Sequence, residues 1–407
     1  MDANLSHSDG GTVAIDASAA IDDASIETAT RPGTFAVSPL YGASVAYQVN
    51  PAHTGNQPTS KLKLPLTRAW SIDLVSLGAA VGAVVSYPLI VDGRIFVTFQ
   101  ANRGAVIEAL DLQSGHRIWG PQDMGDSRLT TWANAAYDAG RVYVVNGNGL
   151  VAALDPATGA TLWSKQMPDQ YSISAPPTAT GGMLFIGGAG EGGTIYAVDG
   201  ASGEVVWKSS VAGGIDSSPA VTSDGVYVSY VCLDVYGFNP LGGSLLWRHH
   251  GSCQGGGGGT PAYYQGQLWV RDPMVDSLVI NAQTGAELAS FKTSTTPALA
   301  DQRAFIQLRG QLQALDVNTR ASQWAFYGDG MLASAPLVVN GTVFIGSSTG
   351  AIFGVDAATG AQVWNDVAPA PVTVYESNTL GFGPIPGLGA GDDSLVVPAG
   401  SHLLCYH

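Results

Sequence analysis

The chain has 407 residues, of which 45% are hydrophobic and only 12% are charged, whereas about 25% are charged in an average soluble protein. Lys and Arg number 17 and Asp and Glu number 32, so the net charge is −15. This balance excludes a protein that needs a basic face to bind nucleic acid, and it disfavours anionic membrane surfaces. No apolar run is long enough for a transmembrane helix, and three cysteines are too few for a cysteine-based structural zinc site.

The N-terminal part differs in composition from the rest. Residues 2–33 contain six carboxylates, one arginine and no aromatic side chain. Such a stretch cannot bury enough apolar surface to offset the entropy lost on ordering. We therefore expect a disordered acidic tether rich in Ala, Ser and Asp at residues 1–35, followed by a lead-in segment at 36–65. The tether contains no signal-peptide core, and its composition resembles the spacer that follows the lipidated cysteine of bacterial surface lipoproteins.

The remainder repeats one pattern, in which Asp or Asn begins a turn that leads through Gly to Trp. The seven copies are anchored at Asp111, Asp155, Asp199, Asn239, Asn281, Asp316 and Asp356. A period near 40 residues that holds short β-branched strands is typical of a propeller or related array. The Asp or Asn accepts backbone N–H bonds and the Gly takes a positive φ. The Trp ring can wedge against the neighbouring sheet.

The two ends of the repetitive part predict how the ring closes. Residues 383–407 contain three short strand patterns and no fourth, whereas Leu66–Leu74 has the Trp-strand pattern without strands before it. Pairing these two regions would remove the exposed edges that an open ring leaves. We therefore predict an all-β fold, an eight-bladed β-propeller with four-stranded antiparallel blades over residues 66–407. An N-terminal strand would complete its C-terminal blade.

The A-x-D-x-x-T-G-x-x-x-W repeat resembles that of the pyrroloquinoline quinone (PQQ)-binding-like propeller superfamily, and Tyr47–Gly55 looks like the leader before the family's first strand. The superfamily includes quinoprotein dehydrogenases, which bind PQQ and Ca²⁺ in the funnel. It also includes the propeller lipoprotein of the outer-membrane β-barrel assembly machinery, which binds protein. The dehydrogenases typically carry a disulfide between adjacent cysteines, and this chain has no Cys-Cys pair. The resemblance implies a non-dehydrogenase member, so we predict no cofactor, with PQQ and calcium as the alternative.

Cysteine and histidine positions suggest a disulfide rather than a metal site. Cys232 and Cys253 lie 21 residues apart, near strand ends that could share one face. A disulfide between them fits an oxidising compartment, and the alternative is two buried thiols. We expect Cys405 to be buried in the closing blade. His249 and His250 precede Cys253, but adjacent side chains on a strand point to opposite faces, so we predict no metal site there.

The loops that enter each blade and those between its second and third strands share one face, around the central funnel. Functional residues concentrate on loops held by a rigid scaffold, and arginines there can hold a carboxylate or another anion. The alternative for each loop residue is a solvated surface position. The predicted ligand-binding residues are Arg103, Asn146, Glu191, Asp216, Arg271, Asp272, Arg309, Tyr327 and Asp329.

No nucleophile constellation emerges, because the sequence contains neither a G-x-S-x-G elbow nor an H-E-x-x-H motif. We therefore predict an exported, monomeric binding or scaffolding module of the bacterial cell envelope. It would lie in the periplasm or at the cell surface, with a lipid anchor on the full-length precursor. Its partner would be an envelope protein, a surface glycan or a small ligand. The alternative is an enzyme that uses the funnel, such as a quinone- or metal-dependent oxidoreductase.

Overall fold

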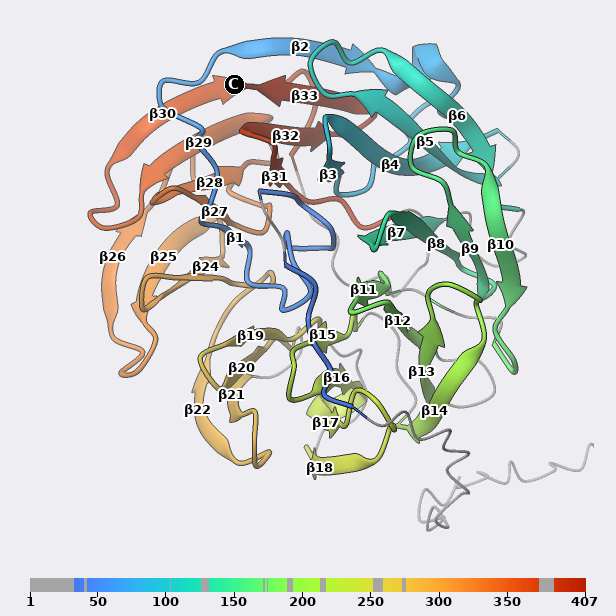
Figure 1. Ribbon diagram of the computed structural model, residues 1–407. Coiled ribbons are helices and arrows are strands. Elements are labelled where there is room, and N and C mark those ends of the chain that lie inside the picture. The colour runs from blue at the N-terminus through green and yellow to red at the C-terminus, as the bar shows by residue number, and fades with distance from the viewer. Residues whose placement is uncertain are drawn as a thin grey trace, which may run out of the picture.

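The computed structural model describes residues 33–39, 42–102, 104–125, 132–170, 173, 175–188, 193–212, 217–251, 259–272, 276–372 and 384–407. The strands of these residues form eight sheets, arranged as the blades of a ring (Figure 1). Within each blade the strands run antiparallel, from an inner strand beside the axis to an outer strand at the rim. The predicted eight-bladed propeller is confirmed.

The first four blades follow one another along the chain. Blade 1 comprises β3 (Leu89–Val91), β4 (Arg94–Ala101), β5 (Gly104–Asp111) and β6 (Arg117–Asp123). Blade 2 comprises β7 (Ala133–Asp138), β8 (Arg141–Asn146), β9 (Leu150–Leu154) and β10 (Thr161–Gln166). Blade 3 comprises β11 (Thr178–Thr180), β12 (Met183–Gly188), β13 (Gly193–Asp199) and β14 (Val205–Val211). Blade 4 comprises β15 (Ala220–Val221), β16 (Val226–Tyr230), β17 (Asp234–Phe238) and β18 (Leu245–His249).

The remaining blades include the two that contain N-terminal strands. Blade 5 comprises β19 (Ala262–Tyr264), β20 (Gln267–Val270), β21 (Ser277–Asn281) and β22 (Glu287–Phe291). Blade 6 comprises β23 (Ala298–Ala300), β24 (Arg303–Leu308), β25 (Gln311–Asp316) and β26 (Ser322–Phe326). Blade 7 comprises β27 (Leu337–Val339), β28 (Thr342–Gly346), β29 (Ala351–Asp356) and β30 (Gln362–Val367), with β1 (Asn56–Gln57) parallel to β27. Blade 8 comprises β31 (Gly389–Gly391), β32 (Ser394–Ala399), β33 (His402–Tyr406) and β2 (Arg68–Asp73).

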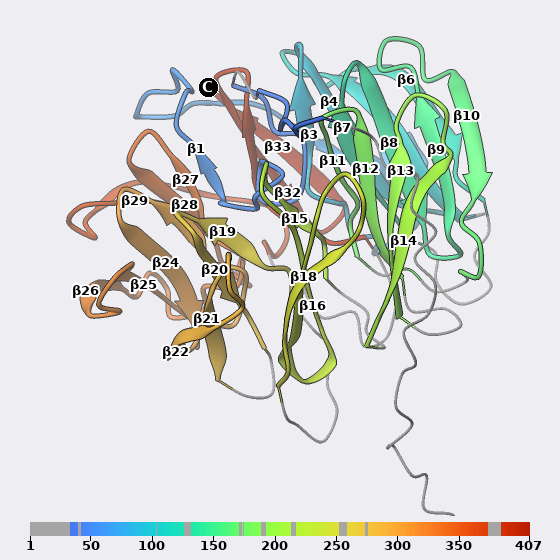
Figure 2. The ribbon, with the colours of Figure 1, turned by 60° about the horizontal axis from the view of Figure 1, so that its bottom comes forward.

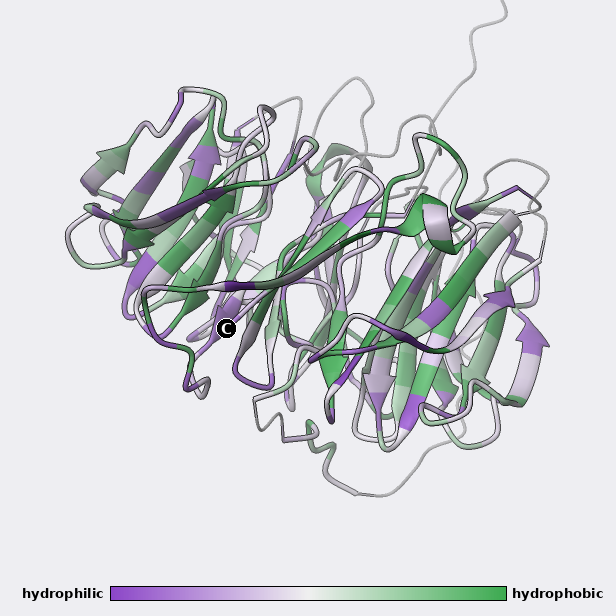
Figure 3. Ribbon diagram, turned by 90° about the horizontal axis from the view of Figure 1, so that it is seen from above, coloured by the Kyte–Doolittle hydropathy of each residue, from purple (hydrophilic) through white to green (hydrophobic). Residues whose placement is uncertain are grey.

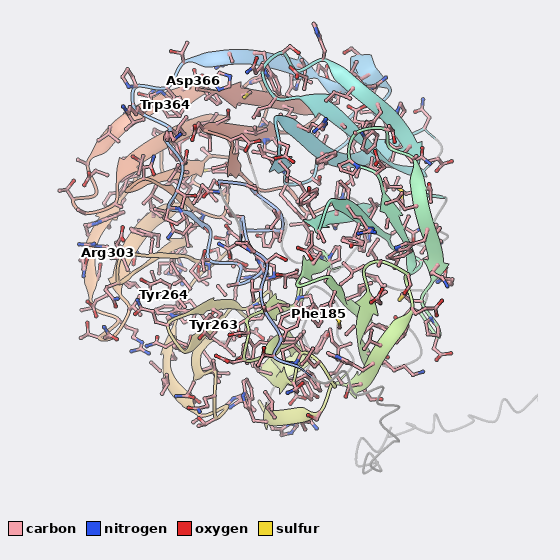
Figure 4. The ribbon with its side chains drawn as sticks, in the orientation of Figure 1. Phe185, Tyr263, Tyr264, Arg303, Trp364 and Asp366 are labelled. Atoms are coloured by element: carbon pink, nitrogen blue, oxygen red, sulfur yellow. The ribbon has the colours of Figure 1, made fainter. Side chains whose placement is uncertain are left out.

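Blade 8 joins the two ends of the propeller. Strand β2 pairs antiparallel with β33 and is the outer strand of this blade, which is the arrangement predicted for Leu66–Leu74. Arg68 of β2 also holds the neighbouring blade, because its Nη2 lies 2.5 Å from the Asp366 carboxylate and 2.7 Å from the Val367 carbonyl oxygen. Figure 4 labels Trp364 and Asp366 on β30, beside this junction. The closing strand is thus fixed by its own sheet and by blade 7.

Six of the outer-strand tryptophans reach the turn of the next blade, and the seventh, Trp364, donates to the Leu66 carbonyl oxygen ahead of β2. The indole N–H of Trp207 donates to the Pro240 carbonyl at 2.8 Å, and that of Trp247 donates to the Ala282 carbonyl at 2.8 Å. The indole ring packs directly on the turn glycine, since a Cβ on Gly243 would lie 2.5 Å from the Trp207 ring. The same contact recurs between Trp70 and Gly115, Trp119 and Gly159, Trp163 and Gly203, Trp247 and Gly285, and Trp324 and Gly360.

The aspartates of the repeat organise the turns between third and fourth strands. The Asp155 carboxylate accepts hydrogen bonds from the backbone N–H groups of Ala157 and Thr158 and from the Thr158 hydroxyl, at 2.8–3.0 Å. These donors stabilise the ionised form, and the Thr158 hydroxyl and backbone lower the pKa of Asp155. The repeat aspartates are therefore turn-forming residues in the structure.

The lead-in segment runs across the middle of the ring, as the blue chain in Figure 1 shows. On their axial side the inner strands meet no other blade strand, so their N–H groups need acceptors from the lead-in segment. The lead-in supplies backbone carbonyls to these groups. Tyr137 donates to Val45, Val221 to Pro51, Tyr263 to Ala52, Leu299 to Thr54 and Val338 to Gly55, all at 2.7–2.8 Å.

His53 lies at the centre of the lead-in segment and is fully buried. Its Nδ1 is 2.7 Å from the Tyr47 carbonyl oxygen, and its Nε2 is 3.0 Å from the Pro219 carbonyl oxygen and 3.3 Å from the Thr178 hydroxyl. Burial lowers the pKa of His53 to about 4, so the ring is neutral at pH 7. Gln48, which is 4% exposed, donates from its Nε2 to the Thr296 carbonyl oxygen. The lead-in thus fills the axis of the propeller.

The core lies between neighbouring sheets, where apolar side chains of adjacent blades meet. Figure 3 shows green, hydrophobic stretches running along the strands, interrupted by purple ones. Phe35 belongs to the segment predicted as tether, yet it is buried and packs edge-on against Phe185 at 5.9 Å between ring centroids. The last residue of the predicted tether is therefore packed, and residues 1–32 of that tether lie outside the described residues. None of the helices among the described residues has the length and apolar character to cross a membrane.

Candidate functional site

The propeller has two faces, because the strands of every blade run between them (Figure 2). One face carries the turns between third and fourth strands, and we call it the turn face. The other carries the connections between second and third strands and between successive blades, and we call it the loop face. Those predicted ligand-binding residues that the structure describes belong to the loop face. Three of the predicted residues, Arg103, Glu191 and Asp216, lie outside the described residues, as does Cys253.

Asn146 is buried and shapes the turn that follows β8. Its Oδ1 accepts hydrogen bonds from the N–H groups of Asn148 and Leu150 at 2.9 Å, and its Nδ2 donates to the Met124 carbonyl oxygen at 2.8 Å. The side-chain amide forms hydrogen bonds through one oxygen and one nitrogen, and both atoms are bonded to backbone groups. Asn146 therefore fixes the loop instead of presenting an amide to solvent.

Arg271 and Asp272 directly follow β20 and are 3% and 4% exposed. The backbone of Gly259 packs against Arg271, because a Cβ on Gly259 would lie 2.5 Å from the Arg271 carbonyl oxygen. The Asp272 N–H donates to the Ser277 hydroxyl at 3.3 Å. These two charged residues are enclosed by blade 5 and do not stand at the molecular surface.

The other three predicted residues gather where blades 6 and 7 meet, and we call Arg309, Tyr327, Asp329 and Met331 the rim patch. The loop after β26 approaches the turn after β24 so closely that a Cβ on Gly310 would lie 2.2 Å from the Gly330 carbonyl oxygen. Tyr327 is 60% exposed and Met331 is 53% exposed. The rim patch therefore presents two large apolar side chains beside an exposed arginine.

Asp329 holds the rim patch rigid. Its carboxylate accepts hydrogen bonds from the hydroxyls of Ser347 and Thr349, each at 2.6 Å, and from the N–H of Met331 at 3.0 Å. Burial acts to raise the pKa of Asp329, but the hydroxyl and N–H donors together lower it, so the carboxylate is ionised at pH 7. A loop fixed by three such bonds loses little entropy when a partner binds.

Sequence reasoning did not include a polar cluster on blade 4. Asp234, which is 5% exposed, accepts a hydrogen bond from Arg248 at 3.1 Å and lies 2.7 Å from Nδ1 of His250. The Arg248 guanidinium also lies 5.1 Å from the centre of the Tyr236 ring. The sequence predicted no metal site at the two histidines, and the place of Asp234 beside them could be recognised only once β17 and β18 were paired.

Calcium with PQQ is the alternative cofactor, and calcium sets a requirement on the residues that would hold it. Calcium needs six to eight oxygen ligands, usually several carboxylates, and no three His, Cys, Asp or Glu side chains come together as a metal site in the described ranges. Asp329 and Asp234 are each already engaged by protein donors. No reaction step through the quinone is therefore derived from these residues.

Comparison with known proteins places the repeat in a family. A sequence profile of the PQQ-type family described as "Outer membrane protein assembly factor BamB" matches residues 67–171, 147–285 and 231–380. The chain belongs to this family. The predicted PQQ-like superfamily is thus confirmed.

Individual relatives of this family have different names. BamB of Yersinia pestis is 31% identical over 152 residues, which are 37% of this chain and 36% of that protein. The 1-butanol dehydrogenase (cytochrome c) of Thauera butanivorans is 30% identical over 132 residues, or 30% of this chain and 18% of that protein. The chain therefore spans well under half of the length of these relatives.

Solved structures share the fold at much lower identity. The quinohemoprotein alcohol dehydrogenase ADHIIG of Pseudomonas putida HK5 superposes with a TM-score of 0.71 and 15% identity, covering 92% of this chain and 82% of that chain. At such identity the likeness concerns the fold alone, because one propeller supports several functions.

Proposed function

We propose that the protein is a binding and scaffolding module of the bacterial cell envelope. Its partner would be an envelope protein that docks on the loop face at the rim patch. The observation that carries this proposal is a rigid loop that exposes Tyr327 and Met331 beside Arg309. Tyr, Met and Arg are enriched at protein interfaces, and Tyr and Arg dominate the binding energy of many of them.

The family supports this reading, because a relative with 31% identity is named an outer membrane protein assembly factor. We propose an extracytoplasmic location on the same basis. A disulfide between Cys232 and Cys253 would suit that location. The described chain passes close to Cys232 at Gly251, where an added Cβ would lie 1.9 Å from the Cys232 carbonyl oxygen. Peptide mapping without reductant should recover the linked pair, and two free thiols would remove this support.

Site-specific photo-crosslinking tests the docking surface. A photoreactive phenylalanine analogue replaces Tyr327 in one protein and Leu162 in another. Leu162 is the matched control because it is also exposed, at 49%, but lies on outer strand β10 of blade 2. In envelope extract of the producing organism we expect a discrete adduct from position 327 that the Met331→Ala change reduces at least fivefold. Equal adducts from both positions, or none from position 327, would contradict the proposal.

A quinone- or metal-dependent oxidoreductase is the second candidate, favoured by the likeness to named dehydrogenases. Calorimetric titration of the purified protein with PQQ, with and without Ca²⁺, separates the candidates. Saturable calcium-dependent heat, followed by turnover of an alcohol or sugar, would establish the enzyme. Absence of heat together with the crosslink at position 327 would leave the scaffold reading. A surface glycan or small ligand as the partner would give binding without a protein adduct.

A further inference from the structure

The turn face holds a concave site beside the axis of the ring. A cavity of about 370 Å³ lies between the lead-in segment and the inner strands of blades 4 and 5. Its apolar walls come from Val37, Ala43, Val49, Pro58, Val221 and Tyr263. Figure 4 labels Tyr263 on the inner strand of blade 5, on the side where the lead-in crosses the ring. The rim patch belongs to the opposite face, so the two sites are separate.

Several polar groups of the lead-in segment around this cavity are already hydrogen-bonded within the protein. Asn50 donates from Nδ2 to the Thr54 hydroxyl at 2.6 Å and accepts from the Thr54 N–H at 3.2 Å. The carbonyl oxygens of Pro51 and Ala52 accept from the N–H groups of inner strands β15 and β19 at 2.7 and 2.8 Å. A ligand therefore meets few unpaired donors or acceptors, and an ion would lose its hydration without compensation. This selects an uncharged, largely apolar ligand.

Tyr263 lines the cavity with an aromatic ring whose orientation is fixed by its neighbours. Its ring is parallel to that of Tyr227, with 6.0 Å between centroids and 3° between planes. Tyr227 in turn stacks on Trp247 at 6.0 Å and 23°. A ring supported from behind by two stacked rings cannot rotate away freely. Aromatic rings pair favourably with other flat rings in offset stacks, so the shape selects a planar ligand.

We propose that this cavity binds an uncharged planar aromatic small molecule of about two fused rings. Volume supports that size, since an apolar cavity of about 150 Å³ holds one benzene and this one is more than twice as large. Tyr263 is the stacking platform and the lead-in segment forms the opposite wall. The inference does not depend on the proposed function, because its residues belong to the other face.

Saturation-transfer NMR with indole as the probe tests the site on the full chain, with cyclohexanol as the non-aromatic comparison. We expect saturable indole binding and at least tenfold weaker binding of cyclohexanol. Tyr263→Leu keeps apolar volume but removes the platform, so it should weaken indole binding at least tenfold. Tyr264→Leu is the matched control, because Tyr264 is the next residue of β19 and does not line the cavity. Its affinity should stay within twofold of wild type.

A second variant keeps the test decisive if Tyr263→Leu unfolds. Val37 is only half-buried on the cavity wall, so Val37→Phe should fill the space and should abolish indole binding. Circular dichroism establishes that each variant is folded. Unsaturable binding by the wild type up to millimolar indole would overturn the proposal, as would unchanged affinity in both Val37→Phe and Tyr263→Leu.

Discussion

Two blade junctions of this propeller solve the same packing problem differently. Between blades 4 and 5, Trp247 lies on Gly285 of the next turn, where a Cβ would come within 2.5 Å of the ring. Between blades 5 and 6 the outer strand carries Ala289 at the tryptophan position, and the turn carries Arg320 at the glycine position. At this junction both the Trp and the Gly of the repeat are therefore replaced by other residues.

The comparison shows why the repeat contains glycine. Arg320 has φ +62°, which is close to the φ +73° of Gly285, so this turn accepts a residue with a side chain. What requires glycine is the tryptophan ring that lies flat on the turn. Where the ring is missing, the Arg320 guanidinium lies 5.9 Å from the centre of the Trp269 ring, which belongs to the preceding blade. The Gly and the Trp of this motif act as one contact between successive blades.

The strongest way to break a regular junction is to remove its ring. Trp207 is 1% exposed and its indole bonds the Pro240 carbonyl oxygen. Trp207→Ala should lower the free energy of unfolding by about 3–5 kcal/mol, as for other buried tryptophans, measured by urea denaturation. Gln323→Ala, on the exposed part of an outer strand, is the control and should change it by less than about 0.5 kcal/mol. Equal losses in the two variants would refute the role of the ring.

His53 at the axis makes the stability of the fold depend on pH. The pKa of His53 is lowered to about 4 in the folded state, against about 6.5 in the unfolded chain. Unfolded chain therefore binds the proton more tightly, and the stability that neutral His53 contributes is present above pH 6.5 and lost as the pH falls towards 4. Relative to His53→Gln, the wild type should lose about 2 kcal/mol between pH 7.5 and 4.5. Denaturation at both pH values measures this, and parallel curves would contradict it.

Adding one methyl group distinguishes the two kinds of turn. Gly285→Ala should lower the free energy of unfolding by about 1–3 kcal/mol. The new Cβ would meet the Trp247 ring, and the alanine would have to adopt a positive φ. Arg320→Ala, at the same place in the next turn, meets no such ring and should cost less than about 1 kcal/mol. Thermal and urea denaturation of both variants give the comparison. A larger loss for Arg320→Ala would reverse our explanation of the glycine.

The smallest effect is expected when the irregular junction is converted into a regular one. Ala289→Trp alone should destabilise the protein, because Arg320 occupies the turn on which the new ring would lie. The double variant Ala289→Trp/Arg320→Gly should return to within about 1 kcal/mol of the wild type, and the non-additivity should exceed about 1 kcal/mol. A double-mutant cycle in urea provides the measurement. Simple additivity of the two changes would show that these positions do not form one contact.

The predicted site residues that the structure describes fall into the rim patch and a buried group. Arg309, Tyr327 and Asp329 were predicted from their loops, and the structure brings them together in the rim patch with Met331. Met331 was missed because no local pattern distinguishes an exposed methionine from a core one. Asn146, Arg271 and Asp272 are buried, since loop position predicts the face of the propeller but not whether neighbouring loops cover a side chain. Their ligand-binding role stays a prediction.

The amino-acid sequence by itself determined the eight blades, the strand that closes the ring and the family, because turn residues, strand periodicity and the Trp repeat are local signals copied seven times. Only the tertiary structure decided which repeat position contacts which, since Ala289 and Arg320 lie on different blades. It also decided the fate of the lead-in segment. That segment occurs once, so no repeat reveals its role in the sequence. Its carbonyl groups can accept hydrogen bonds from inner-strand N–H groups only when the ring has brought those strands together.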